Sequence, residues 1–173
     1  SGTTLLGSDT ADDDGTFSIT SSTLSDGSYS LTATATDAAG NTSVASNPLS
    51  IIVDATAPER PLSLTTVEFI TQNITPTITG NAEANSTVKL YSGTTLLGSD
   101  TADDDGTFSV TSSTLSDGSY SLTATATDEA GNVSSTSDLL SITIDTAEPN
   151  APTSLTTISV TTNDRTPEIT GSA

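Results

Sequence analysis

The sequence predicts an all-β fold, arranged as tandem β-sandwich repeats of about 91 residues. Ser1–Ala82 aligns without gaps on Ser92–Ala173, and 58 of the 82 aligned pairs are identical. Apolar residues alternate with Ser and Thr in short runs, and this period of two indicates strands with one buried face. Stretches rich in Gly, Asp and Asn separate the runs at intervals of roughly 8–12 residues, which is typical of sandwiches.

Two segments that contain proline, at 54–58 and 145–149, have few large apolar residues and are interpreted as linkers. They divide the chain into three parts. We expect a complete repeat at 56–146, preceded at 1–55 by the C-terminal part of a repeat and followed at 147–173 by the N-terminal strands of the next. The chain is therefore interpreted as a window from a longer array.

Seven strands are expected in the complete repeat, one for each run in which apolar and polar residues alternate. They are 62–66, 75–82, 86–91, 94–99, 107–111, 119–128 and 139–145. Gly80 in the second strand allows a close approach of neighbouring groups. Ser92 and Gly93 form the turn into the fourth strand, and the acidic segment 102–106 forms the turn into the fifth. Segments 115–118 and 129–132 are the remaining turns.

Because alternate side chains of a strand share one face, the positions of the apolar residues in each strand predict which side chains form the core. In the longest run, Tyr120, Leu122, Ala124 and Ala126 share one face, with Ser and Thr on the other. The other positions expected to face inward are Ile78, Val88, Leu90, Phe108, Val110, Leu140, Ile142 and Ile144. Seven short strands in about 91 residues match an immunoglobulin-like sandwich.

A local motif supports this fold class. The hexapeptide Leu115–Tyr120 stands just before the longest strand, and Leu24–Tyr29 repeats it. Its tyrosine has the position of a tyrosine corner, in which the phenol donates a hydrogen bond to the upstream backbone. A buried tyrosine without this bond is the alternative. The chain has no Cys and no Trp, so an antibody-type domain is excluded.

The composition excludes several classes of function. The chain has 22 acidic residues, 3 basic residues and no His, and its net charge is −19. Without Cys and His, zinc sites, iron–sulfur clusters and a Ser-His-Asp triad are excluded. The negative charge opposes binding to nucleic acid and to anionic lipid, and no apolar run reaches the roughly 18 residues of a membrane span. No signal peptide is recognised, and we expect a non-catalytic protein.

Three stretches resemble the bacterial Ig-like repeats of giant surface adhesins and biofilm-associated proteins. They are Ile78–Asn85, Asp117–Asn132 and Ile144–Thr146. The resemblance implies a structural spacer, or extender, in the stalk of a type I secreted adhesin or biofilm matrix fibre. It also implies an extracellular location on the bacterial surface, neighbouring repeats of the same chain as partners, and Ca²⁺ at the junctions between repeats.

Strand directions make a separate case for Ca²⁺. If the strands alternate in direction, the incoming linker and the loops after the second, fourth and sixth strands lie at one end of the sandwich. These connections carry the acidic residues Asp54, Glu83, Asp103 to Asp105 and Asp128, with Asn132. Asp37 is the equivalent of Asp128 in the preceding part, and Asp145 serves the next linker. Carboxylates from several loops suit Ca²⁺, which takes six to eight oxygen ligands, better than Mg²⁺.

Other interpretations stay open at this stage. The acidic residues are also ordinary turn formers, and Asp103 and Asp105 precede a glycine as in an Asp-Gly hairpin turn. An EF-hand is excluded because Ser112 stands where the loop needs Glu. A carbohydrate-binding sandwich and a filament in which identical chains exchange strands are the alternative functions. An isopeptide bond would need Lys89, which is expected to face solvent.

Overall fold

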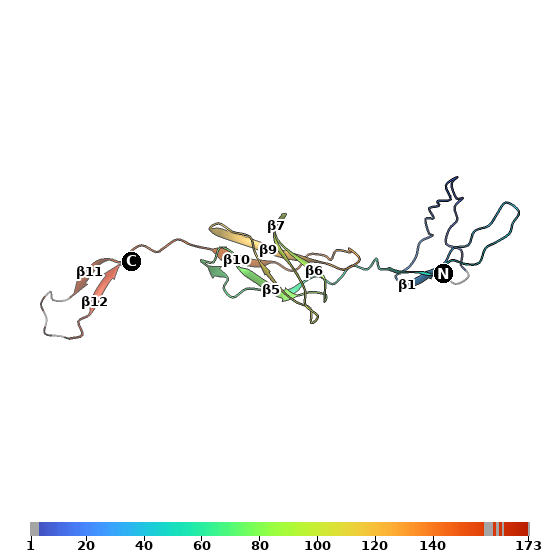
Figure 1. Cartoon of the computed structure of the whole chain (residues 1–173). Helices are drawn as coiled ribbons and strands as arrows, with labels where there is room; N and C mark the ends of the chain where they lie inside the picture. Colours follow the sequence, from blue (N-terminus) through green and yellow to red (C-terminus); the bar gives the residue numbers. More distant parts are fainter. Residues whose placement is uncertain (1–3, 158–160, 162, 164, 173) are drawn as a thin grey trace.

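The computed structural model describes residues 4–157, 161, 163 and 165–172, and these residues form strands without helices. Figure 1 shows an elongated molecule with a central sandwich and a smaller part on either side. The N-terminal part holds β1 (Gly27–Leu31) paired antiparallel with β2 (Leu49–Val53). Beyond the sandwich, β11 (Thr153–Thr157) pairs antiparallel with β12 (Ile169–Ser172). In the part of the chain that the structure describes, nothing has the length and apolarity of a membrane-spanning helix.

The central unit (residues 56–146) is a two-layered β-sandwich, as predicted. One layer has five strands in the order β4-β10-β9-β6-β7, and the other has three in the order β3-β5-β8. The bounds of the five are β4 Ile70–Thr71, β10 Leu140–Ile144, β9 Gly118–Thr127, β6 Thr87–Ser92 and β7 Thr95–Thr101. The bounds of the three are β3 Leu62–Thr65, β5 Thr77–Asn81 and β8 Thr107–Thr111.

The expected strands agree with these elements to within a few residues, and β4 is the strand that the periodicity missed. This two-residue strand runs parallel to β10, with Thr143 N donating to the carbonyl oxygen of Phe69 at 2.8 Å. Asp145 N donates to the carbonyl oxygen of Thr71 at 2.9 Å. The chain crosses here from the three-stranded layer to the five-stranded one. A strand of two residues is too short to show an alternation of apolar and polar residues, and its partner β10 is distant in the sequence, so the sequence carries no signal for β4.

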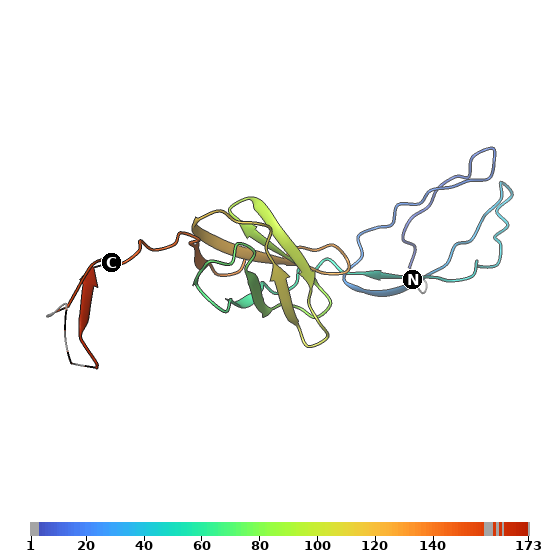
Figure 2. The same ribbon diagram turned by 60° about the vertical axis from the view of Figure 1, so that its left-hand side comes forward.

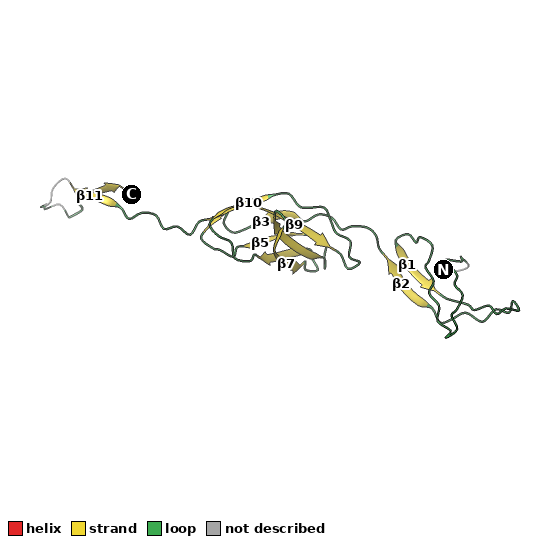
Figure 3. Ribbon diagram, turned by 90° about the horizontal axis from the view of Figure 1, so that it is seen from above, coloured by secondary structure: helices red, strands yellow, loops and turns green. Residues whose placement is uncertain are grey.

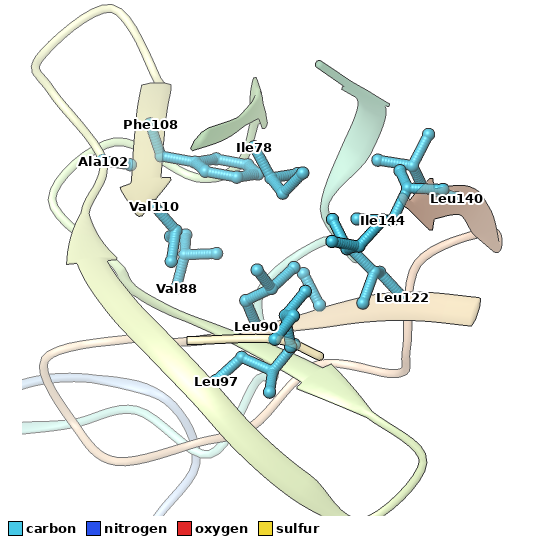
Figure 4. Close-up of a cluster of buried hydrophobic side chains, with 13 residues drawn as sticks. Ile78, Val88, Leu90, Leu97, Ala102, Phe108, Val110, Leu122, Leu140 and Ile144 are labelled. Carbon is cyan, nitrogen blue, oxygen red and sulfur yellow. The ribbon is translucent and has the colours of Figure 1, made fainter. Parts of the chain in front are cut away.

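The side chains predicted to face inward form the core between the layers, as Figure 4 shows. Ile78, Val88, Leu90 and Leu122 are completely buried. Tyr120 packs against this core while keeping its hydroxyl near the surface. The other members of the buried apolar cluster are Leu97, Ala102, Phe108, Val110, Leu115, Ala124, Leu140, Ile142 and Ile144. The large apolar side chains that the unit buries therefore form one small core.

Both tyrosine corners are confirmed. Tyr120 Oη donates to the carbonyl oxygen of Ser116 at 2.9 Å, and Tyr29 Oη donates to that of Ser25 at 2.7 Å. The glycine that begins each strand, Gly118 in β9 and Gly27 in β1, has φ = 147° and 148° respectively, a conformation that side chains with a Cβ rarely adopt. The motif therefore sets both the start of β9 and the direction from which the chain enters it.

Replacing the corner hydroxyl tests its contribution. We expect Tyr120→Phe to lower the free energy of unfolding by about 1 kcal/mol, because the bond to the carbonyl oxygen of Ser116 is lost. Denaturant unfolding followed by circular dichroism measures the change. The matched control is Tyr91→Phe, which removes a hydroxyl from a half-buried tyrosine of β6 outside the corner. Equal effects of the two substitutions would contradict a special role for the corner.

A second substitution tests the close approach at Gly80. A Cβ there would lie 2.8 Å from the carbonyl oxygen of Leu62 and 2.7 Å from the ring of Phe108. We expect Gly80→Ala to destabilise the unit by roughly 1–3 kcal/mol through overpacking, measured as a lower denaturation midpoint. Ser121→Ala, at an exposed position on β9, is the control. A neutral Gly80→Ala variant would show that β3 can move away at no cost.

Candidate functional site

The first linker (residues 54–61) is hydrogen-bonded from both of the units that it joins. On the N-terminal side, the carboxylate of Asp26 accepts bonds from Ala55 N at 3.0 Å and from Thr56 Oγ1 at 2.5 Å. On the other side, Asn132 Nδ2 of the central unit donates to the carbonyl oxygen of Asp54 at 3.1 Å. Three consecutive linker residues are thus bonded to side chains outside the linker. The extended course of this segment can be followed in Figure 2.

The loop between β9 and β10 (residues 128–139) presents Asn132 to the linker. Asp128 closes the start of the loop, accepting Asn132 N at 2.8 Å on Oδ1 and Asn132 Nδ2 at 2.9 Å on Oδ2. The bond from the Asn132 side chain is the main reason why the pKa of Asp128 lies below its usual value. In the N-terminal part, Asp37 and Asn41 form the same two bonds, both at 2.8 Å. The orientation of Asn132 is therefore a local property of the loop.

An ion pair adds a further contact between the linker and the same loop. Arg60 Nη1 lies 2.6 Å from Asp138 Oδ1, and this hydrogen bond lowers the pKa of Asp138. The side chains are 37% and 87% exposed, so water and salt screen the pair and its contribution to stability is small. The residues at the equivalent positions are Ala151 and Asn47, which cannot form an ion pair. The contact is therefore specific to the first linker.

The second linker (residues 145–152) repeats the bonds on its N-terminal side. Asp117 Oδ1, equivalent to that of Asp26, accepts Thr146 N at 3.2 Å and Thr146 Oγ1 at 2.8 Å. Asp145 Oδ1 accepts Ala147 N at 3.1 Å, just as Asp54 Oδ1 accepts the amide two residues on at 3.0 Å. Each linker thus begins with an aspartate that closes its own turn, and residues directly after it donate to the aspartate of the preceding tyrosine corner.

The acidic residues predicted to converge at one end of the sandwich are distributed over two pairs of connections. The linker with Asp54 contacts the loop with Asp128, as described above. The loop with Glu83 instead lies beside the acidic turn between β7 and β8, where Ala82 N donates to the carbonyl oxygen of Gly106 at 2.8 Å. The predicted adjacency of the connections is therefore correct within each pair. A single cluster of carboxylates is not formed.

Asp103 and Asp105 close that acidic turn. Asp105 Oδ1 accepts Thr107 N at 3.1 Å and Thr107 Oγ1 at 2.9 Å, and the same hydroxyl lies 3.3 Å from Asp103 Oδ2. These bonds lower the pKa of Asp105. Glu83 uses its backbone: its carbonyl oxygen accepts Ser86 Oγ at 2.7 Å while its side chain is exposed. The turn-forming alternative thus accounts for the contacts of Asp103 and Asp105.

The donor set does not fit a preformed calcium site. Among the residues that the structure describes, no three carboxylates or other metal-binding side chains lie together in an arrangement that could hold an ion. Both oxygens of Asp128 accept bonds from Asn132, whereas Ca²⁺ needs six to eight oxygens. Calcium binding by the seven predicted residues stays a prediction. They are Asp37, Asp54, Glu83, Asp103, Asp105, Asp128 and Asp145.

Sequence reasoning missed Asp26, Asp117, Arg60 and Asp138. A usable signal was present for the first two, because the tyrosine corner lies at the end of the sandwich from which the next linker leaves. An aspartate in the corner motif is therefore close to the first linker residues in any unit of this topology. The pairing of Arg60 with Asp138, 78 residues apart, has no signal in a single sequence.

Comparison with known proteins identifies the module. The model of the family described as bacterial Ig-like domain matches residues 1–55 and 64–146. Chitinase A1 of Niallia circulans is 35% identical over a region that covers 66% of this chain and 17% of that protein. The chain thus spans about a sixth of the length of this curated relative.

Two solved structures are similar to this chain at a lower sequence identity. A biofilm associated protein BSP domain is 25% identical with a TM-score of 0.42, and the match covers 83% of this chain and 23% of that one. The fibronectin(III)-like modules of CbhA from Clostridium thermocellum are 20% identical with a TM-score of 0.48. That match covers 76% of this chain and 70% of theirs.

The junction carboxylates predict an acid-labile fold. The pKa values of Asp26, Asp128 and Asp138 lie below the ordinary 3.8 in the folded chain. Their stabilisation is therefore fully present above the unfolded value and is lost as pH falls through the folded values. We expect the melting temperature to be constant from about pH 8 to 5 and to fall below about pH 4.

Circular dichroism melts across this range, with ¹³C carboxyl shifts to assign the titrating groups, provide the measurement. The chain has no His, so no imidazole titration near neutral pH complicates the profile. Folded-state pKa values at or above 3.8 for these three carboxyls would contradict the hydrogen bonds described here.

Proposed function

Because the chain belongs to the bacterial Ig-like domain family, we propose that it is a non-catalytic spacer in the stalk of an extracellular adhesin or biofilm matrix fibre on the bacterial surface. One observation carries the proposal: the linker between successive units is bonded to side chains of both. A spacer works through length and resistance to bending, and these bonds restrict the joint at which an array would bend. The partners are then neighbouring repeats of the same chain.

The arrangement of the parts supports the same function. The first linker enters the central unit at one end, and the second leaves beyond β10 at the other, so units follow one another in a row (Figure 3). Each unit then adds nearly its full length to the array, instead of folding back on its neighbour. The net charge of −19 keeps such chains apart in solution.

A filament of strand-exchanging chains is a second candidate, favoured by the exposed apolar side chains of the N-terminal part. There Phe17 and Ile19 are 60% and 42% exposed, whereas their equivalents Phe108 and Val110 are buried. Against strand addition to the central unit, Asp100 Oδ2 accepts Ser109 N at 2.7 Å and so occupies a donor on the β8 edge. Concentration-dependent mass measurements in solution distinguish a filament from a monomeric spacer.

A role in sugar binding has less support. The relative of this chain named chitinase A1 suggests an accessory module beside an enzyme that acts on chitin. Sugar sites on sandwiches usually display several aromatic rings. In the described residues of the central unit, Phe69 is the aromatic side chain that is largely exposed. Retention of the chain on insoluble chitin, with a Phe69→Ala variant alongside, would favour this alternative.

Small-angle scattering tests the spacer proposal. We expect the chain to be extended in solution, with a maximum dimension close to that of the row of units in the structure. A variant with eight Gly and Ser residues inserted after Pro58 is the matched control, and its dimension distribution should broaden because a flexible segment separates the units. A compact wild-type chain, or one that scatters like the insertion variant, would contradict a stiff spacer.

A further inference from the structure

We propose that the first linker is held by interleaved hydrogen bonds that need no metal ion, with Asn132 as the residue that positions the linker on the central unit. The proposal rests on the spacer function and names the interactions that make the joint stiff. It concerns the joint between the N-terminal part and the central unit, where the described residues include both sides.

The order of the bonds along the chain is the first argument. The following unit, through Asn132, binds the carbonyl oxygen of Asp54. The preceding unit, through Asp26, binds the later residues Ala55 and Thr56. The two sets of bonds therefore overlap, and no free stretch of linker lies between them. A change in the angle between the units has to break at least one set, whereas bonds in the opposite order would leave a hinge.

The chemistry of Asn132 is the second argument. Its carboxamide nitrogen carries two hydrogens. One is donated to Asp128 Oδ2 at 2.9 Å and the other to the carbonyl oxygen of Asp54 at 3.1 Å. These two oxygens, one carboxylate and one carbonyl, are of the type that a calcium ion would bridge. The amide group already bridges them with both of its hydrogens, so the same connection is made without a cation.

The preceding unit also contacts the linker through hydrogen bonds to one side chain, that of Asp26. The carboxylate of Asp26 accepts from a backbone amide and from a hydroxyl of the linker. Hydrogen bonds to an ionised carboxylate are stronger than those between neutral groups. They also satisfy the acceptor directly, so the negative charge at this point of the junction is stabilised by donors of the chain itself. Arg60 adds a cation on the far side of the linker, paired with Asp138.

The chain supplies matched controls for both residues. Asn41 closes its own loop through Asp37 as Asn132 does through Asp128, but among the described residues it faces no linker. Asp117 makes the bonds of Asp26 at the second linker. Asn41→Ala and Asp117→Ala thus reproduce the local losses of Asn132→Ala and Asp26→Ala, while leaving the first linker intact.

Distances between spin labels on either side of the joint test the proposal. The chain has no Cys, so the labels attach only at introduced positions. Ser30→Cys on β1 and Ser121→Cys on β9 are exposed, equivalent positions in the two units. Double electron–electron resonance then reports the distribution of distances in EDTA and in excess Ca²⁺. Circular dichroism confirms that each variant keeps its strands.

We expect a narrow distribution in EDTA that Ca²⁺ does not change. Asn132→Ala should increase the population outside the main peak by roughly two- to tenfold, the effect of one lost hydrogen bond to the linker. Asp26→Ala removes two bonds to the linker and should increase this population by at least as much. Asn41→Ala and Asp117→Ala should leave the distribution unchanged.

Three results would overturn the proposal in distinguishable ways. A distribution that is narrow only with Ca²⁺ contradicts the metal-free joint and leaves the spacer function standing. A narrow distribution that neither Asn132→Ala nor Asp26→Ala broadens contradicts the role of these bonds alone. A wild-type distribution that is broad in both solutions contradicts the stiff spacer itself, and with it the proposed function.

Discussion

The connections of this molecule depend on one recurring interaction, the hydrogen bond from a backbone amide or a hydroxyl to an aspartate carboxylate. Asp105 closes the turn between β7 and β8 in this way, and Asp128 closes the loop between β9 and β10. Asp54 shapes the start of the first linker, and Asp26 bonds that linker to the preceding unit. The strands contribute the core, but these carboxylates determine how the strands follow one another.

This use of aspartate explains how a chain with net charge −19 can fold. The carboxylates lie at the surface, where water screens their repulsion, and donors of the chain itself stabilise many of them. The pKa values of Asp14, Asp37 and Asp105 are lowered for the same reason as those at the junction. A large excess of acidic residues therefore does not by itself require metal ions.

The prediction of the fold succeeded because its signals are local. The alternation of apolar and polar residues identified the strands and their inward faces, and the corner motif identified Tyr120 and its bond to the upstream backbone at Ser116. Calcium binding at one end of the sandwich stays a prediction, and among the described residues no three metal-binding side chains lie together. Whether carboxylates from several loops converge depends on how each loop folds, and Asp105 and Asp128 each accept hydrogen bonds within their own loops.

The strands, their inward faces and the tyrosine corners follow from residues that stand close together in the sequence, since successive side chains of a strand point to opposite faces. The contacts that hold the linker are different. Asn132 meets Asp54 over 78 positions, and Asp26 meets Thr56 over 30. Pairs so distant are brought together by strand pairing and packing: Gly27 pairs with Val53 beside Asp26, and the packing of the central unit decides which loop faces the linker. The hydrogen bonds of the joint are thus a property of the tertiary structure, built on units whose fold the repeat pattern already specifies.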